Sequence, residues 1–191
     1  MQDLKGDCAM IFAIDTETTG LHASRHECIE IALVGLNSDL SLNGHEYVSR
    51  IRPSEMGFKL MQPEAFNVNK ITKEELMVAP NTAQVRRSLL EWKSEITGEK
   101  IEPLGHNYLF DKGFIANFLG EDLYSEMFDY HVRDSCILAQ CLKDIGYKLP
   151  IGLKKLAVHF GISTEALHSA RGDALLTVEV YKRLVGLIKL V

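Results

Sequence analysis

Hydrophobic and polar positions in the first quarter of the chain follow the pattern of β-strands. Three segments rich in Ile, Val and aromatic residues, 10–15, 29–36 and 46–51, are separated by clusters of Gly, Asn and Ser. Because the links between them are short, these segments predict an antiparallel meander.

After Pro80 the apolar residues recur at helical spacing, beginning with Val85, Leu89 and Trp92. A short strand is expected at 101–105. Further helices are expected from about 108, at 135–144, at 152–160 and at 170–190. Strands first and alternating elements later predict an α/β fold, with a mixed sheet covered by helices on both faces.

The length of 191 residues suits a single domain, 1–191, in which residues 1–9 are expected to form a flexible N-terminus. Hydrophobic residues make up 46% and charged residues 25%, as in ordinary globular proteins. No apolar run approaches the roughly 18 to 20 residues of a membrane span, and the start lacks the features of a secretory signal. These features predict a cytoplasmic protein without membrane partners.

The four cysteines show no C-x-x-C pair, so reduced and mostly buried thiols are expected rather than a zinc or disulfide framework. The formal net charge of −5 argues against a nucleic-acid-binding protein, because such binding usually depends on Lys and Arg. The objection weakens if several carboxylates belong to a metal site, because bound divalent cations make the local field positive.

Two acids, Asp15 and Glu17, come at the end of the first predicted strand. Residues at i and i+2 on a strand project from the same face, so both carboxylates point one way. Like charges this close repel unless a cation neutralises them, and hard divalent metals prefer such oxygen sites. The alternative is a polar strand end in which Thr and Gly form a turn.

A third acid, Asp111, is predicted about one turn into a helix that Asn107 would cap. Phe114, Ile115 and Phe118 lie three, four and seven residues after it, so Asp111 is on the apolar face. An unpaired charge there would be costly, so a cation or a strong donor is expected. A salt bridge is the alternative.

The last predicted helix repeats this feature, because Asp173 shares a stripe with Leu176, Val180 and Leu184. Two inward acids at helix starts suggest one shared site. His168 is expected on the loop before this helix, where a hydrogen-bonded surface residue is the alternative.

Taken together, these segments resemble the DEDDh exonucleases of the DnaQ-like group, which includes the proofreading epsilon subunit of bacterial replicative polymerase and exonuclease X. The three ordered motifs are Asp-Thr-Glu-Thr-Thr-Gly at 15–20, the segment 106–111, and His168 with Asp173. A weaker match covers 63–72, where the family usually has His-Gly and this chain has Asn69-Lys70. Asp134 also resembles a family position and is interpreted as a helix N-cap. The resemblance implies a ribonuclease H-like fold, with a mixed five-stranded sheet flanked by helices.

The resemblance also implies two divalent ions, Mg²⁺ or Mn²⁺, and assigns roles to five residues. Asp15 would bridge the ions, Glu17 and Asp173 would help hold the ion that binds the attacking water, and Asp111 would support the second ion. His168 would accept the proton of the water, a role that suits an imidazole near neutral pH. Contacts with substrate are implied for Thr18, Leu21, Asn107 and Phe114.

The expected reaction is 3′→5′ hydrolysis of phosphodiester bonds at single-stranded or frayed DNA ends, or of RNA, with release of nucleoside monophosphates. The sequence stops at Val191, directly after the last predicted helix, which favours a free-standing nuclease over a subunit tethered to a polymerase. The rival hypothesis is a catalytically inactive nucleic-acid-binding or scaffold protein of the same fold. It is disfavoured because all five expected catalytic positions are filled.

Overall fold

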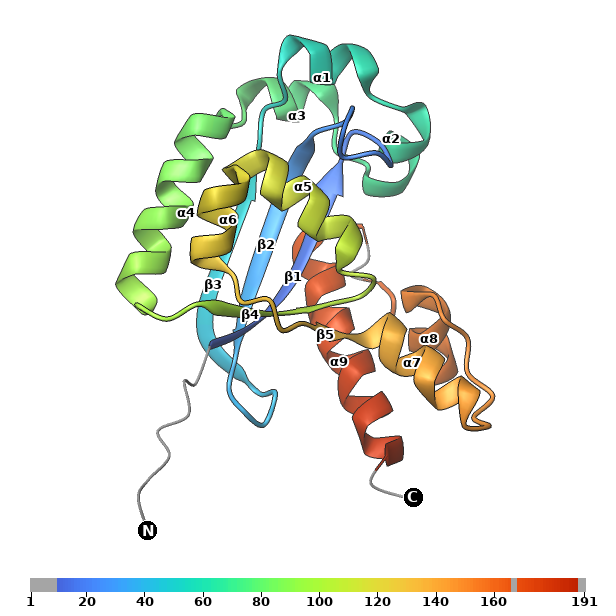
Figure 1. The fold of residues 1–191 in the computed structure, drawn as a ribbon. Helices are drawn as coiled ribbons and strands as arrows, with labels where there is room; N and C mark the ends of the chain where they lie inside the picture. Colours follow the sequence, from blue (N-terminus) through green and yellow to red (C-terminus); the bar gives the residue numbers. More distant parts are fainter. Residues whose placement is uncertain (1–9, 166–167, 189–191) are drawn as a thin grey trace.

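The computed structural model describes residues 10–165 and 168–188, which form a five-stranded sheet with helices on both faces (Figure 1). The strands are β1 (Met10–Thr18), β2 (Cys28–Leu36), β3 (Leu42–Arg50), β4 (Ile101–Gly105) and β5 (Arg133–Asp134). Their order across the sheet is β3-β2-β1-β4-β5, so β1 is the central strand. The first three strands pair antiparallel, whereas β4 and β5 add parallel to β1, which confirms the predicted mixed sheet.

The helices fill the connections between strands and the C-terminal part of the chain. They are α1 (Glu55–Leu60), α2 (Pro63–Asn69), α3 (Lys73–Val78), α4 (Thr82–Ile96), α5 (Leu109–Leu119), α6 (Glu121–Met127), α7 (Ser135–Asp144), α8 (Leu153–His159) and α9 (Ala170–Ile188). Of those described, no helix is both long enough and apolar enough for a bilayer crossing.

Alternation along β1 divides the core into two layers. Ile11 and Ala13 pack with Ala174 and other residues of α9 on one face of the sheet. Phe12 and Ile14 belong to the larger cluster on the opposite face, which includes residues of α4, α5 and α6. Because Asp15 and Glu17 continue the odd-numbered series, the strand places both acids on the α9 face.

The predicted elements differ from the structure mainly at their ends. β1 continues to Thr18 because its pairing with β2 runs on, with a register shift between Glu17 and Thr18. β3 begins at Leu42, earlier than the predicted 46–51. The helices α1, α2, α3 and α6 have six or seven residues each, too few to produce a clear periodic signal. Helix 135–144 agrees with the prediction at both ends.

The prediction that Asn107 caps α5 is wrong. Asn107 has a left-handed backbone with φ of 60°, and the N-cap position belongs to Tyr108, whose side chain forms no capping bond. The carboxylate of Asp134 accepts instead from the backbone N–H groups of Asn107 and Tyr108, at 3.0 and 2.8 Å. The same carboxylate accepts from Cys136 and Ile137 and so caps α7, as predicted for Asp134. One acid therefore fixes the starts of two helices.

Two further expectations need comment. The predicted flexible N-terminus, residues 1–9, lies outside the described residues. Among the three described cysteines only Cys28 is buried, whereas Cys136 is half-buried and Cys141 is exposed. The prediction that the thiols are mostly buried was therefore wrong.

Candidate active site

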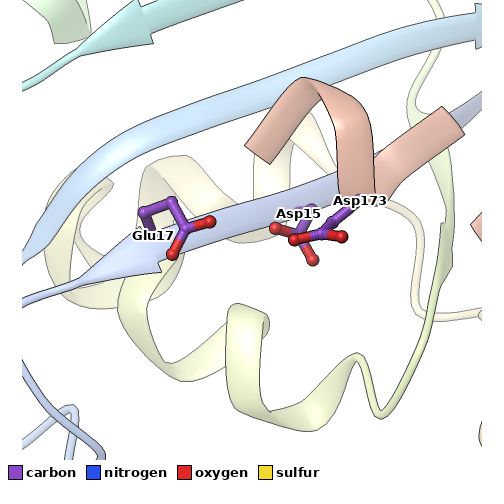
Figure 2. A group of neighbouring side chains, drawn as sticks. All are labelled: Asp15, Glu17 and Asp173. Carbon is purple, nitrogen blue, oxygen red and sulfur yellow. The ribbon is translucent and has the colours of Figure 1, made fainter. Parts of the chain in front are cut away.

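Three carboxylates meet near the C-terminal end of β1. Asp15 and Glu17 lie on β1, and Asp173 comes from the first turn of α9, as Figure 2 shows. One carboxylate oxygen of each residue lies within 4.8 Å of those of the other two. The predicted convergence of acids separated by more than 150 positions is therefore present for these three residues.

The position of Asp173 follows from how α9 begins. The Oγ of Ser169 accepts from the N–H of Gly172 at 3.1 Å, and its carbonyl accepts from the N–H of Asp173 at 3.0 Å. This is the usual geometry of a Ser N-cap. Ala174 and Val178 pack α9 on the sheet, whereas Leu176, Val180 and Leu184 pack it against α7 and α8. Asp173 is therefore directed toward β1 by the packing of the helix.

The electrostatics of the cluster favour a cation. Burial, followed by the charges of Asp111, Asp173 and its other acidic neighbours, raises the pKa of Asp15 well above its usual value. Burial and the same kind of repulsion raise the pKa of Glu17 to about 8. Burial also raises the pKa of Asp173, against the opposing effect of the backbone and charge of His168. Oδ1 of Asp173 is buried and, within residues 10–165 and 168–188, has no hydrogen-bond partner.

Asp111 approaches from the other face of the sheet. Its side chain is 3% exposed, and its Oδ1 accepts from the backbone N–H and the hydroxyl of Thr16 at 2.9 and 2.7 Å. Burial raises its pKa to about 7, although the bonds from Thr16 oppose the rise. Among the described residues Asp111 is not part of the group within 4.8 Å, but its charge acts on Asp15.

His168 is exposed and lies two residues before α9. Its φ of 82° is in the left-handed region, which a residue with a side chain seldom adopts. Its influence on the pKa of Asp173 shows that it lies close to the carboxylate cluster. The predicted loop position is confirmed. Leu167, the residue before His168, lies outside the described residues.

A pocket of about 380 Å³ adjoins the carboxylate cluster. Glu17 and Thr18 line it from β1, and Leu21, which is 70% exposed, lines it from the following loop. Most of the remaining wall comes from α2, the residue before it and α5: Gln62, Glu64, Ala65, Val68, Asn69 and Phe110. Most of the surface that lines the pocket is apolar, as in sites that bind small molecules.

Two of the predicted substrate residues lie elsewhere. Phe114 is 1% exposed and belongs to the hydrophobic core, so the structure does not support it as a substrate contact. Phe110, one helical turn earlier, packs against Phe114 with 5.0 Å between ring centroids and does reach the pocket. Asn107 is exposed and is not among the residues that line the pocket.

The sequence analysis missed one buried acid near the site, Glu30 of β2. Its side chain is on the α9 face because Glu30 pairs directly with Glu17 in the antiparallel register. Its Oε2 accepts from the N–H of Ala170, at the start of α9, at 2.8 Å. In the sequence, the signal for Glu30 was an acid within the otherwise apolar segment 29–36. Only the pairing of the two strands shows that this acid lies next to Glu17.

The comparisons with known proteins agree with this arrangement. The DNA polymerase III epsilon subunits of Escherichia coli and Salmonella typhimurium are 29% and 30% identical over 181 residues, which cover 91% of this chain and 70% of each relative. That of Treponema pallidum is 25% identical, covering 91% of this chain and 75% of the relative.

Solved structures show the same fold. Escherichia coli exonuclease I in complex with a dT13 oligonucleotide superposes with a TM-score of 0.76 at 23% identity, covering 92% of this chain. The match covers only 41% of exonuclease I. Cell-death related nuclease 4 gives a TM-score of 0.73 at 12% identity, over 95% of this chain and 65% of that one.

A family model described as RNase T exonuclease matches residues 12–181, a span that contains the carboxylate cluster, Asp111 and His168. A match of this extent, together with the epsilon relatives and the shared fold, decides the family. The chain belongs to the RNase T exonuclease family and is a DnaQ-like exonuclease with a ribonuclease H-like fold.

Proposed function

We propose that this enzyme is a metal-dependent 3′→5′ exonuclease that releases nucleoside monophosphates from single-stranded or frayed DNA ends, with RNA as the alternative substrate. The observation that carries the proposal is the cluster of Asp15, Glu17 and Asp173 beside an apolar pocket. A nucleotide matches both features, because its charged phosphate suits the cluster and its flat base suits the pocket. We also propose that the whole chain forms one exonuclease domain, because the family match extends over most of it.

The residues present fit divalent cations. Three carboxylate oxygens lie close enough to share an ion, and no group in the described part of the chain hydrogen-bonds to Oδ1 of Asp173. Mg²⁺ and Mn²⁺ prefer carboxylate oxygens. Asp15, Glu17 and Asp173 would hold one ion, and Asp15 with Asp111 would hold the second. When bound, two such ions supply a nucleophile at neutral pH and stabilise the charge that develops on the leaving oxygen.

His168 is proposed to take the proton of the attacking water. The side chain is exposed, so it can reach a substrate that lies over the cluster. Its neighbour in sequence, Ser169, is fixed by the cap of α9, so the histidine has a defined point of attachment. General base catalysis needs this combination of reach and position.

The pocket is proposed to receive the terminal nucleotide. Leu21 and Phe110 offer apolar surface on which a base can stack, and such contacts do not depend on the identity of the base. Thr18 presents the backbone after Glu17 at the same wall, while its own hydroxyl donates to the carbonyl of Gly20 at 2.8 Å. A wall at this position would admit a strand end and block a continuing strand, which favours an exonuclease over an endonuclease.

The relatives support single-stranded DNA as the first substrate to test. Exonuclease I was solved with a DNA oligonucleotide, and the epsilon relatives are named as subunits of a DNA polymerase. A polymerase is therefore the class of protein partner to test. Binding to one would contradict the expectation of a free-standing enzyme. The rival hypothesis, an inactive scaffold protein, leaves unexplained why Oδ1 of Asp173 is buried without a hydrogen-bond partner among the described residues.

A ladder assay tests the proposal. Oligonucleotides of DNA and RNA labelled at the 5′ end should shorten one nucleotide at a time with Mg²⁺ or Mn²⁺ and should remain intact with EDTA. The same DNA with a blocked 3′ end should resist. Shortening from the 5′ end, or binding without hydrolysis in either metal, would overturn the proposal.

A further inference from the structure

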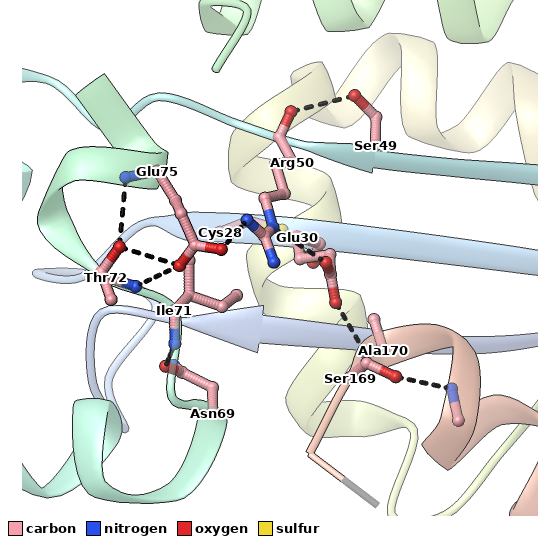
Figure 3. Close-up of polar contacts among 11 residues, drawn as sticks. Cys28, Glu30, Ser49, Arg50, Asn69, Ile71, Thr72, Glu75, Ser169 and Ala170 are labelled. Carbon is pink, nitrogen blue, oxygen red and sulfur yellow. Dashed lines mark hydrogen bonds and ion pairs between the residues drawn. The ribbon is translucent and has the colours of Figure 1, made fainter. Parts of the chain in front are cut away.

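The start of α9 is attached to the sheet through a single buried carboxylate. The N–H of Ala170 is the first of the helix and has no intrahelical acceptor, as in any helix. It donates to Oε2 of Glu30 at 2.8 Å (Figure 3). Ala170 lies two residues after His168 and three before Asp173. This bond therefore holds the chain between two residues that the proposed chemistry requires, one on α9 and one on the loop before it.

Glu30 would not occupy this position without a compensating charge. It is 7% exposed and pairs with Glu17 across the two strands, and like charges directly opposite are destabilising. Nε of Arg50 lies 3.5 Å from Oε1 of Glu30, an ion-pair distance. The guanidinium therefore offsets the repulsion and leaves Oε2 directed toward α9.

Arg50 is itself held by a second acid. Its Nη1 donates to Oε1 of Glu75 at 2.6 Å. The other oxygen of Glu75 accepts from the N–H and the hydroxyl of Thr72, both at 2.8 Å, and so completes the capping box of α3. Figure 3 shows the resulting series of contacts, which runs from α3 through β3 and β2 to α9.

The same series begins beside the proposed nucleotide pocket. Ile71, next to Thr72, donates its N–H to Oδ1 of Asn69 at 3.1 Å. Asn69 lines the pocket, and its side-chain amide lies 3.4 Å from the carbonyl of Thr18. The pocket wall and the start of α9 are thus linked through these polar contacts and the peptide bond between Ile71 and Thr72.

We propose that Glu30 is a positioning residue, held by Arg50, which fixes the start of α9 and thereby sets His168 and Asp173 against β1. The inference rests on the proposed nuclease function. It assigns Glu30 no contact with substrate or metal, because the described group of possible ligands contains Asp15, Glu17 and Asp173 without it. Residues that orient catalytic groups typically contribute about 10- to 100-fold to activity.

Four variants test the assignment. Glu30→Ala removes the acceptor of the Ala170 N–H, whereas Glu30→Gln keeps an oxygen that can accept from it. Arg50→Met removes the ion pair with Glu30. Arg171→Met is the matched control, because Arg171 is in the same turn of α9 and forms an exposed ion pair with Glu46, at 2.5 Å.

Three measurements are needed: hydrogen exchange of peptides from the start of α9 without substrate, kcat and KM on a DNA oligonucleotide, and the number of Mn²⁺ ions bound. Glu30→Ala should speed exchange at the start of α9 and lower kcat about 10- to 100-fold, with KM and the number of ions unchanged. Glu30→Gln should recover most of the loss. Arg50→Met should lower kcat by a smaller factor, and Arg171→Met should stay within about twofold of the wild type, as expected for an exposed ion pair.

Two results would overturn the assignment. Loss of a bound Mn²⁺ in Glu30→Gln would make Glu30 a ligand, and wild-type exchange and kcat in Glu30→Ala would remove its positioning role. If Glu30→Ala does not fold, Arg50→Met and Glu30→Gln carry the test. If the wild type has no nuclease activity the proposed function fails, and the exchange measurement still decides whether Glu30 holds α9.

Discussion

Two regions of the molecule bury acids near the ends of strands β5 and β1, and they differ in what the carboxylates contact. Asp134, at the end of β5, accepts hydrogen bonds from four backbone N–H groups. The cluster of Asp15, Glu17 and Asp173 lies near the end of β1, and one of its buried oxygens has no hydrogen-bond partner in the part of the chain that the structure describes.

The comparison shows that burial of an acid does not by itself indicate chemistry. Asp134 satisfies the free N–H groups at the starts of two helices, so its negative charge stabilises the fold. In the cluster, burial raises the pKa of all three carboxyl groups, and repulsion by neighbouring acids adds to the rise for Asp15 and Glu17. An acid site that opposes its own ionisation is a candidate for cation binding and catalysis.

The largest expected effect comes from Asp173→Asn. Nuclease activity should fall below detection, while the metal-free melting temperature stays the same or rises because repulsion in the cluster is relieved. Mn²⁺ should raise the melting temperature of the wild type much more than that of the variant. Equal stabilisation of both proteins by Mn²⁺ would show that Asp173 is not a ligand.

His168→Ala should reduce kcat about 10²- to 10⁴-fold, the usual contribution of a general base. Its affinity for Mn²⁺, measured by titration, should remain close to that of the wild type because the imidazole is not a proposed ligand. A kcat close to that of the wild type at saturating metal would assign the base elsewhere.

Asp134→Ala should affect stability rather than metal binding. The loss of two helix caps should cost about 2 kcal/mol or more, which lowers the melting temperature by roughly 4 to 8 °C in a chain of this length. Binding of Mn²⁺ by the folded variant should be little changed. A stability equal to that of the wild type would mean that water replaces the carboxylate, and the contrast between the two acid regions would be lost.

The smallest expected effect is a dependence of stability on pH. Because the folded pKa of Glu17 is raised from 4.5 to about 8, the folded state binds more protons than the unfolded state between these values. Its contribution to stability is therefore present at low pH and is lost as the pH rises through this window. In EDTA, the melting temperature of the wild type should fall more steeply from pH 5 to 8 than that of Glu17→Gln. Parallel curves would contradict the raised pKa.

The sequence by itself determined the class of fold and most of the site. Alternation at i and i+2 places Asp15 and Glu17 on one face of a strand whatever the partners of that strand are. Helical spacing likewise places Asp111 and Asp173 on inward faces beside apolar residues, and the structure agrees for both. These are local geometric facts, so they can be predicted without knowledge of the tertiary structure.

Tertiary structure decided what depends on pairing between distant segments. Only the register of β1 with β2 sets Glu30 opposite Glu17, and only the packing of α9 on the sheet brings the Ala170 N–H to Glu30. The start of α5 depends on Asp134, 27 residues beyond Asn107, so local capping rules chose the wrong residue. Phe110 rather than Phe114 reaches the pocket for the same reason: neighbouring elements, not helical spacing, decide which side of α5 is covered.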